Sequence, residues 1–324
     1  MKRILSFITV LALTAGASLA QESEVFVDQV GDGNTAEVVQ IGSGHMAVVG
    51  QGRFDVGASD LAPSLDHMLQ PGQATSNTAS QMQEGDSHQA LILQGAEGGM
   101  ATGNTASQVQ SGSETGARIG QGIEGTATGN EATQSITGLH NFAIIDQGVA
   151  GTAAGNAATQ RQDGDVHWAT IEQGAGGDAA GNVAVLVQSG SYQDAQIEQG
   201  VWYGTATDNE AYIEQEAADN TARIEQGVAD AAATGNSAEV TQLGSYSRAT
   251  ITQGADVGTA VANGAVIRQS VGSHHVAAIT QGHDDATAEN NEAAIDQLGT
   301  GHEADVLQGE MGVAIGNSAL VEQA

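Results

Sequence analysis

The chain has 324 residues, a formal net charge of −31, 45 glycines, no cysteine and only ten Phe, Trp and Tyr residues. This charge excludes nucleic acid and anionic lipid as electrostatic partners. The absence of cysteine excludes disulfides and thiolate metal sites, and the few aromatic residues exclude a large aromatic core.

Residues 1–20 have the pattern of a secretory signal peptide. Lys2 and Arg3 precede an apolar run from Ile4 to Leu13, and Ser18-Leu19-Ala20 supplies small residues for cleavage. No later run approaches the roughly 20 apolar residues of a membrane helix. We therefore expect an exported chain without membrane insertion, whose net charge after cleavage is −33 because Lys2 and Arg3 are lost.

The predicted repeat domain spans 21–324 and begins with an isolated strand, Ser23 to Gln29. A first two-strand unit follows, and then an insertion at 53–73, which carries both prolines of the chain. Within the insertion, Asp60 to Leu69 has the start signals of a short helix, with Pro63 in its first turn. We interpret the insertion as a surface excursion.

Beyond the insertion, nearly the whole chain is copies of one unit. In Asn156 to Gly174, two seven-residue segments alternate small or apolar residues with polar ones, and each ends in Gln. Side chains alternate between faces in an extended chain, so each segment reads as a β-strand. The Asn that opens the first strand recurs every 26–28 residues from Asn77 onward, and the third residue of the second strand is Ala in all ten copies.

Between units lies a third element, with the consensus Gly-Thr-Ala-Thr-Gly-Asn seen at 125–130. Its Ala recurs three residues before each Asn, which indicates a bend or a short third strand that passes close to its neighbours. Units of this length with period-2 alternation predict an all-β fold, a β-solenoid of about ten stacked two-strand turns.

Asn and Gln occupy inward positions of these strands, on the same face as the recurring Ala and Ile. A buried amide without a partner costs about 1–3 kcal/mol, but an amide stacked on its copy in the next turn both donates and accepts. We therefore predict amide ladders inside the solenoid, made of Asn34, Gln40, Gln51, Gln83, Gln94, Asn104, Gln110, Gln121, Asn130, Gln147, Asn156, Gln162, Gln173, Asn182, Gln188, Gln199, Asn209, Gln215, Gln226, Asn236, Gln242, Gln253, Gln269, Gln281, Gln297, Gln308, Asn317 and Gln323.

Both ends of the repeat array look like ordinary repeat strands. Ser23 to Gln29 and Asn317 to Gln323 have the same pattern as the strands between them, whereas most solenoids end in atypical capping repeats. We expect both strand edges to be free to pair with another copy of the chain.

The pattern N-x-A-x-x-x-Q, followed by a second strand that ends in Gln, resembles the curlin repeat over about 23–324 apart from the insertion. Curlins are subunits of curli, the extracellular amyloid fibres of bacterial biofilms. The resemblance implies export through the periplasm, self-assembly at the cell surface, and roles in matrix and adhesion. It also implies a nucleating curlin-type subunit and an outer-membrane secretion channel as partners, and Asn34, Gln40, Gln51 and their equivalents as the stacks that hold the fibre.

A run of carboxylates precedes the second-strand Gln in four consecutive units: Asp146, Glu172, Glu198 and Glu225. Alternation places them on the outer face, where like charges about 5 Å apart repel by roughly 1 kcal/mol per neighbour even at water's dielectric. Bound cations or mild acid would relieve this repulsion. No cofactor is expected otherwise, and Ca²⁺ is the candidate ion for this ladder.

The sequence was also searched for catalytic motifs, metal sites and features of other solenoid proteins. No nucleophile–base pairing, phosphate loop or zinc-type spacing is present, so the chain is not expected to be an enzyme. Five His (45, 88, 167, 275 and 302) open second strands, where ring-to-ring hydrogen bonding is favoured over a metal site. Two rival functions stay open: an ice-binding solenoid, suggested by Thr residues of the bend, and a Ca²⁺-binding repeat adhesin.

Overall fold

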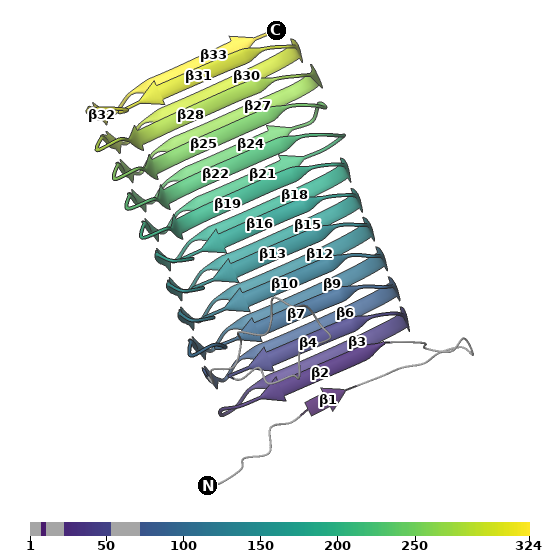
Figure 1. Ribbon diagram of the computed structural model, residues 1–324. Coiled ribbons are helices and arrows are strands. Elements are labelled where there is room, and N and C mark those ends of the chain that lie inside the picture. The colour runs from purple at the N-terminus through teal and green to yellow at the C-terminus, as the bar shows by residue number, and fades with distance from the viewer. Residues whose placement is uncertain (1–7, 11–22, 53–71) are drawn as a thin grey trace.

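The computed structural model describes residues 8–10, 23–52 and 72–324. It is a β-solenoid of three parallel sheets in which the chain climbs from the N-terminal to the C-terminal end, one rung at a time (Figure 1). The predicted helix at 60–69 and most of the predicted signal peptide lie outside the described residues. The predicted fold class is confirmed.

Sheet A contains the first strand of each unit. Its 12 strands are, in spatial order, β1 (Ile8–Val10), β3 (Thr35–Ser43), β6 (Thr78–Asp86), β9 (Thr105–Ser113), β12 (Glu131–Leu139), β15 (Ala157–Asp165), β18 (Val183–Ser191), β21 (Glu210–Gln215), β24 (Ser237–Gln242), β27 (Gly264–Ser273), β30 (Glu292–Thr300) and β33 (Ser318–Gln323).

Sheet B contains the second strand of each unit. Its 11 strands are β2 (Glu24–Gln29), β4 (Met46–Gln51), β7 (Gln89–Gln94), β10 (Gly116–Gln121), β13 (Phe142–Gln147), β16 (Trp168–Gln173), β19 (Asp194–Val201), β22 (Thr221–Val228), β25 (Arg248–Ala255), β28 (Val276–His283) and β31 (Glu303–Gln308).

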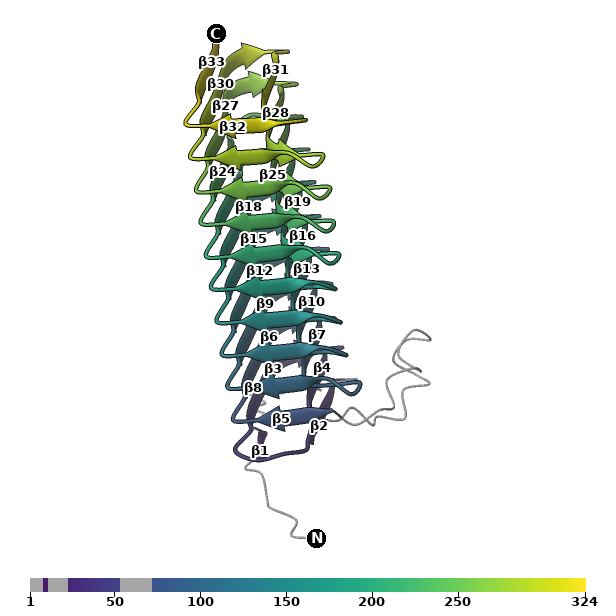
Figure 2. The same ribbon diagram turned by 90° about the vertical axis from the view of Figure 1, so that its left-hand side faces the viewer.

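Sheet C contains the element between units. The sequence predicted either a bend or a short third strand there, and the structure has a strand. Its ten short strands, stacked toward the viewer in Figure 2, are β5 (Gln73–Thr75), β8 (Met100–Thr102), β11 (Thr126–Thr128), β14 (Thr152–Ala154), β17 (Asp178–Ala180), β20 (Thr205–Thr207), β23 (Ala232–Thr234), β26 (Thr259–Val261), β29 (Thr287–Glu289) and β32 (Val313–Ile315). Gln73, placed in the insertion by the sequence, is the first residue of β5.

Like residues lie directly over like residues. In sheet B, Ala117 of β10 pairs with Ala143 of β13, and Gln121 pairs with Gln147. The core between the sheets is correspondingly made of stacked Ala and Ile, such as Ile197 and Ile224, which are fully buried. Identical side chains on a parallel ladder repeat every ~4.8 Å, so each contact is made again on the next rung.

Glycine is needed where the corner between sheets A and B is tightest. Gly138 has a φ of 116°, and a Cβ built on it would lie 1.8 Å from the carbonyl oxygen of Gly164 on the next rung. An L-side chain fits neither the conformation nor the space. The corner therefore keeps a Gly on successive rungs, at Gly112, Gly138 and Gly164.

The predicted leader is not wholly separate from the fold. The backbone of β1 (Ile8–Val10) pairs in parallel with β3, with Ile8 opposite Ala36 and Val10 opposite Val38. The signal-peptide composition of residues 1–20 predicts a segment outside the repeat domain at 21–324. In the full-length chain, three of these residues occupy the sheet A edge below β3 (Figure 1).

Candidate self-assembly site: amide ladders and strand edges

The longest amide ladder runs inside sheet B. From Gln51 to Gln308, each Gln Nε2 donates to the Oε1 of the Gln one rung above, at 2.7–2.9 Å. The Nε2 groups also reach sheet A backbone carbonyls; for example, Gln121 donates to Thr105 O at 3.2 Å. These side chains are almost completely buried, so each amide is satisfied inside the core rather than by water.

The Gln ladder of sheet A has the same direction but is broken once. It runs from Gln40 to Gln110 and again from Gln162 to Gln323, with Nε2–Oε1 distances of 2.8–3.0 Å. Ile136 stands in the gap. As a consequence, Gln162 Oε1 is buried and has no hydrogen-bond partner in the part of the chain that the structure describes.

The Asn ladder runs in the opposite direction. From Asn77 to Asn291, each Nδ2 donates to the Oδ1 of the Asn one rung below, at 3.0–3.3 Å. The same Nδ2 groups donate to the carbonyl of the central Ala of a sheet C strand, as Asn130 does to Ala153 O at 2.9 Å. At the top, Asn317 joins through its backbone N–H, which donates to Asn291 Oδ1 at 2.9 Å. The Asn side chains thus hold together the corner at which the chain passes from sheet C to sheet A, through hydrogen bonds to both neighbouring rungs.

A fourth, short ladder was missed as a site. Gln81, Gln108, Gln134 and Gln160 lie at an inward position of sheet A that is aliphatic elsewhere, and their Nε2–Oε1 distances are 2.8–2.9 Å. The sequence signal was four Gln in consecutive units, two residues before the ladder position. Because aliphatic residues occupy the same position in the other units, the repeat pattern alone does not predict a ladder there.

Four of the five His residues that open second strands stack in pairs by their rings, His45 with His88 and His275 with His302. His45 and His88 have centroids 5.1 Å apart and planes within 6° of parallel. Their Nε2 atoms lie 3.1 and 3.0 Å from the backbone carbonyls of Ile41 and Glu84. Burial lowers the pKa of His88 below its ordinary value, which favours the neutral ring. The expected ring-to-ring hydrogen bond is therefore wrong for this pair.

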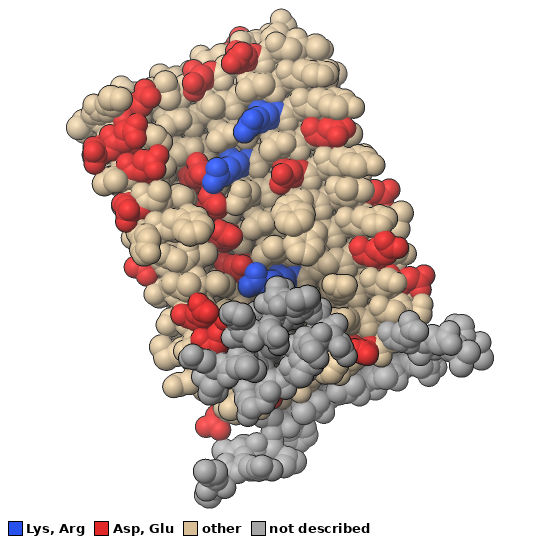
Figure 3. Space-filling model, viewed as in Figure 1, with Lys and Arg blue, Asp and Glu red and all other residues tan. Residues whose placement is uncertain are grey.

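The four carboxylates stack in register on the outer face of sheet B, but two of them are covered there. Asp146 is only 7% exposed and Glu198 only 4%. Asp146 Oδ1 lies beside the space above Gly120, and Ile123 and Val149, from turns toward sheet C, border the same space. The alternation of residues along the strand predicts that these carboxylates lie on the outer face of sheet B, but it does not predict that two of them are buried there. Acidic side chains (red) outnumber basic ones on the face drawn in Figure 3.

Two arginines partly neutralise this carboxylate ladder. Arg118 Nη1 lies 3.1 Å from Asp146 Oδ2, and Arg223 Nη2 lies 2.8 Å from Glu198 Oε2 and 2.7 Å from Glu225 Oε1. Among the described residues, no ion pair involves Glu172. The carboxylate in the middle of the ladder therefore has acidic neighbours on both rungs and no cation of its own.

The pKa values follow from this arrangement. Burial, and then the negative charges of Glu198 and Asp146, raise the pKa of Glu172 to about 7. Burial also raises the pKa of Asp146 and of Glu198, while Arg118 and Arg223, respectively, counteract part of the rise. Near neutral pH, the Glu172 carboxyl is thus poised between its two forms.

The ladders reach the outermost described strands at both ends. At the lower end, Gln29 Oε1 is shielded from solvent and has no hydrogen-bond partner among the described residues. At the upper end, Gln308 Nε2 donates to Glu292 O and Gln323 Nε2 donates to Glu303 O, which leaves each amide a second hydrogen. Strands β31, β32 and β33 each end the spatial order of their sheet.

Residues 20–52 match a family model described as the curlin associated repeat. The match supports a relationship between this chain and the curlin family. The matched residues include strands β2, β3 and β4, which follow one another with no sheet C strand between them. A search of curated proteins finds no match to the chain. Among the described residues, no helix could span a membrane.

Proposed function

We propose that this chain is a secreted structural subunit, of curli type, that assembles edge to edge into extracellular amyloid fibres for biofilm matrix and adhesion. Its main partner is another copy of itself. A nucleating curlin-type subunit starts growth, and an outer-membrane channel delivers the chain from the periplasm to the cell surface. The curlin-type repeat at 20–52 and the all-β architecture support a structural rather than an enzymatic role.

The observation that carries the proposal is the matched polarity of the two ends. The upper end offers amide hydrogens from Gln308 and Gln323, and the lower end offers the shielded oxygen of Gln29. When one copy stacks on another, the sheet B ladder continues from Gln308 of the first copy into Gln29 of the second. Each added copy would give a partner to the shielded Gln29 oxygen, which is unpaired among the described residues, and to the second amide hydrogens of Gln308 and Gln323. This favours addition at an existing edge.

Assembly is tested by incubating the purified chain, after removal of residues 1–20, at micromolar concentration. We expect thioflavin-positive fibres that seed fresh monomer and diffract at ~4.8 Å along the fibre axis. A chain that remains monomeric for days at high concentration, with and without seeds, would contradict the proposal.

A ladder variant tests whether the stacked amides matter for assembly. The double substitution Gln173→Leu with Gln199→Leu removes two neighbouring rungs of the sheet B ladder, and it should lengthen the lag phase at least several-fold. Gln89→Leu is the matched control, because Gln89 is an exposed residue on the outer face of the same sheet. Equal lag phases for the double variant and the control would show that stacked amides do not drive growth.

We also propose that Ca²⁺ accelerates growth by screening Glu172 and Glu225, the two partly exposed carboxylates of the ladder. Fibre growth rates in chelator and in millimolar Ca²⁺ are the measurement. Equal rates would eliminate a role for the cation while leaving the assembly proposal intact.

No observation favours the two rival functions. Ice binding would need an unbroken Thr array on the outer positions of sheet C, but Ala154, Ala180 and Val261 interrupt it. The repeat adhesin would need a recurrent Gly-Gly-x-Gly-x-Asp nonapeptide, which the sequence lacks.

A further inference from the structure

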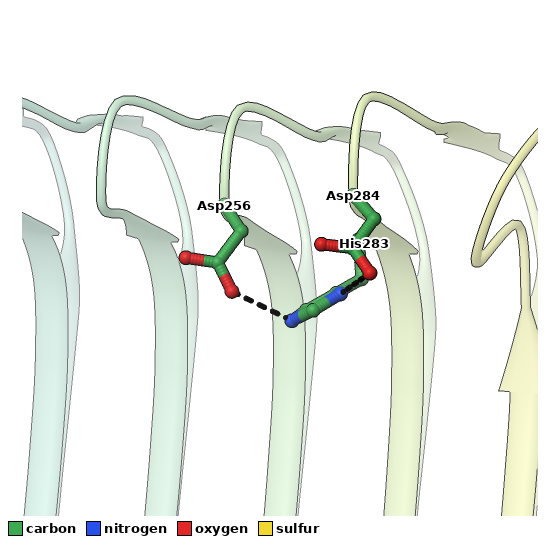
Figure 4. A group of neighbouring side chains, drawn as sticks. All are labelled: Asp256, His283 and Asp284. Carbon is green, nitrogen blue, oxygen red and sulfur yellow. Dashed lines mark ion pairs between the residues drawn. The ribbon is translucent and has the colours of Figure 1, made fainter.

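Two successive turns between sheets B and C bring one histidine and two carboxylates together. His283 Nε2 lies 2.9 Å from Asp256 Oδ2, and His283 Nδ1 lies 3.3 Å from Asp284 Oδ2 (Figure 4). One possible ligand atom from each residue lies within 4.8 Å of those of the other two. We propose that this cluster, Asp256, His283 and Asp284, binds one divalent transition-metal ion of the Zn²⁺ class.

The fold, rather than sequence proximity, creates the cluster. Asp256 and Asp284 occupy equivalent places in turns one rung apart, as the bond from Asp285 N to Asp256 O shows. Both have a positive φ, 47° and 53°, so the two turns have the same shape and carry their carboxylates in the same way. Stacked carboxylates of this kind repel each other, and a cation between them removes the repulsion.

His283 breaks the pattern of its own ladder. The residues at this position on the preceding rungs are Val201, Val228 and Ala255, which are all buried apolar side chains. The small Ala255 one rung below leaves room, and both residues line a cavity of about 240 Å³ together with Asp256. An imidazole thus replaces an apolar side chain on a rung where carboxylates stand both below it and beside it. Glu310 lines the same cavity.

The donor set selects the class of ion. Imidazole nitrogen with carboxylate oxygens suits Zn²⁺ and its neighbours in the transition series, whereas Ca²⁺ takes six to eight oxygen ligands. Three protein ligands leave a coordination position for water, for which the cavity has space. Tetrahedral Zn²⁺ with bonds of about 2.0–2.2 Å places its ligand atoms roughly 3.4 Å apart. One ion binds only one ring nitrogen of His283, so one of the two carboxylates would turn toward the nitrogen that faces the other, from ligand atoms that now lie within 4.8 Å of one another.

The test is titration of ZnCl₂ into the untagged, folded chain without residues 1–20, followed by calorimetry, with Co²⁺ absorption as a second readout of coordination. Before assembly, we expect one high-affinity Zn²⁺ per chain and much weaker binding of Ca²⁺. His283→Val should weaken binding at least tenfold and should fold normally, since Val stands at this position on two other rungs. If it does not fold, Asp256→Ala serves instead, because Ala229 is its equivalent one rung below.

His140→Ala is the matched control, because His140 is an exposed turn histidine paired with a single carboxylate, Glu114, at 2.6 Å. It should bind Zn²⁺ as the unchanged chain does. The proposal is overturned if His283→Val retains full affinity, if His140→Ala loses it, or if Ca²⁺ binds as tightly as Zn²⁺. Because binding is measured on the single chain, the result does not depend on whether fibres form.

Discussion

Two ladders run side by side along sheet B, and they behave in opposite ways. Gln173 and its copies point into the core, while Glu172 and its copies, one residue earlier, point to the outer face. The spacing between rungs is the same for both. An amide both donates and accepts, so stacking satisfies it, whereas a carboxylate only accepts and carries charge, so stacking raises its energy.

The lengths of the two ladders reflect this difference. The amide ladder continues through every described rung of sheet B, but the carboxylate ladder stops after four. Gly120 precedes it and Thr252 follows it, and the Thr252 hydroxyl donates to Glu225 Oε2 at 2.9 Å. Arg118 lies on the strand of Gly120, just below the run, and Arg223 lies on the strand of Glu225, at its upper end. In a parallel stack, the attraction or repulsion between a side chain and its copy is thus repeated on every rung.

The largest effect on stability is expected when the same Ile→Gln substitution is made at two sites, one in a Gln ladder and one in an Ile stack. Ile136→Gln would fill the gap in sheet A, where Gln110 lies below and the unpaired Gln162 Oε1 lies above. Ile224→Gln would instead insert an amide between Ile197 and Ile251. An unpaired buried amide costs about 1–3 kcal/mol on top of the lost apolar burial.

We therefore expect Ile224→Gln to lower the free energy of unfolding by about 3 kcal/mol more than Ile136→Gln does. Denaturant titration of both variants, monitored by circular dichroism, measures the difference. Equal losses would mean that partners in the ladder do not decide the stability of a buried amide here.

A smaller effect is expected from removing the central charge of the carboxylate ladder. The folded-state pKa of Glu172 is raised from 4.5 to about 7, so the fold favours the protonated form. Stability is therefore lost as pH rises from about 4.5 through 7, and the loss above 7 reaches about 3 kcal/mol. Glu172→Gln should abolish this loss: it should stabilise the chain at pH 8 and have little effect at pH 4.

Stability measured between pH 4 and 8 tests this prediction, with Glu131→Gln as the control because Glu131 is an exposed acid at the start of β12. If the two variants show the same pH profile, then the place of Glu172 between two other carboxylates has no energetic consequence.

The smallest effect is expected at His167. Burial lowers its pKa from 6.5, while Asp163 and Asp165 counteract part of the shift. The unfolded chain then takes up this proton first, so stability is present above 6.5 and declines as pH falls below it. His167→Asn, which copies Asn141 one rung below, should make the acid side of the stability profile shallower. An unchanged slope between pH 5 and 6.5 would contradict this.

Sequence periodicity was sufficient for the sheets, the register and most of the amides, because a repeat with one Asn and two Gln per unit admits few stacked arrangements. The third strand was left open between a bend and a strand, since three residues around one Ala carry little pattern. The short ladder from Gln81 to Gln160 was overlooked because aliphatic residues occupy its position in other units.

The repeat pattern does not predict contacts between residues that occupy different positions of the repeat unit. Asp146 is buried next to a space that Ile123 and Val149 also border, and these two residues belong to turns whose sequence varies from unit to unit. The cluster of Asp256, His283 and Asp284 needs the exact stacking of two such turns. The pairing of β1 with β3 involves a segment whose composition indicates a signal peptide.

The shared direction of the Gln amides has an electrical consequence. Each side-chain amide has a dipole comparable to that of a peptide unit, about 3.5 D, and aligned dipoles add along an axis, as they do in a helix. Between Gln51 and Gln308 every Gln carbonyl points one way, and the Asn ladder cancels only part of the sum. A filament of such subunits would be a polar rod with unlike tips, one of them electropositive. A subunit arriving upside down would meet its own sign, and elongation should proceed at different speeds from the two tips.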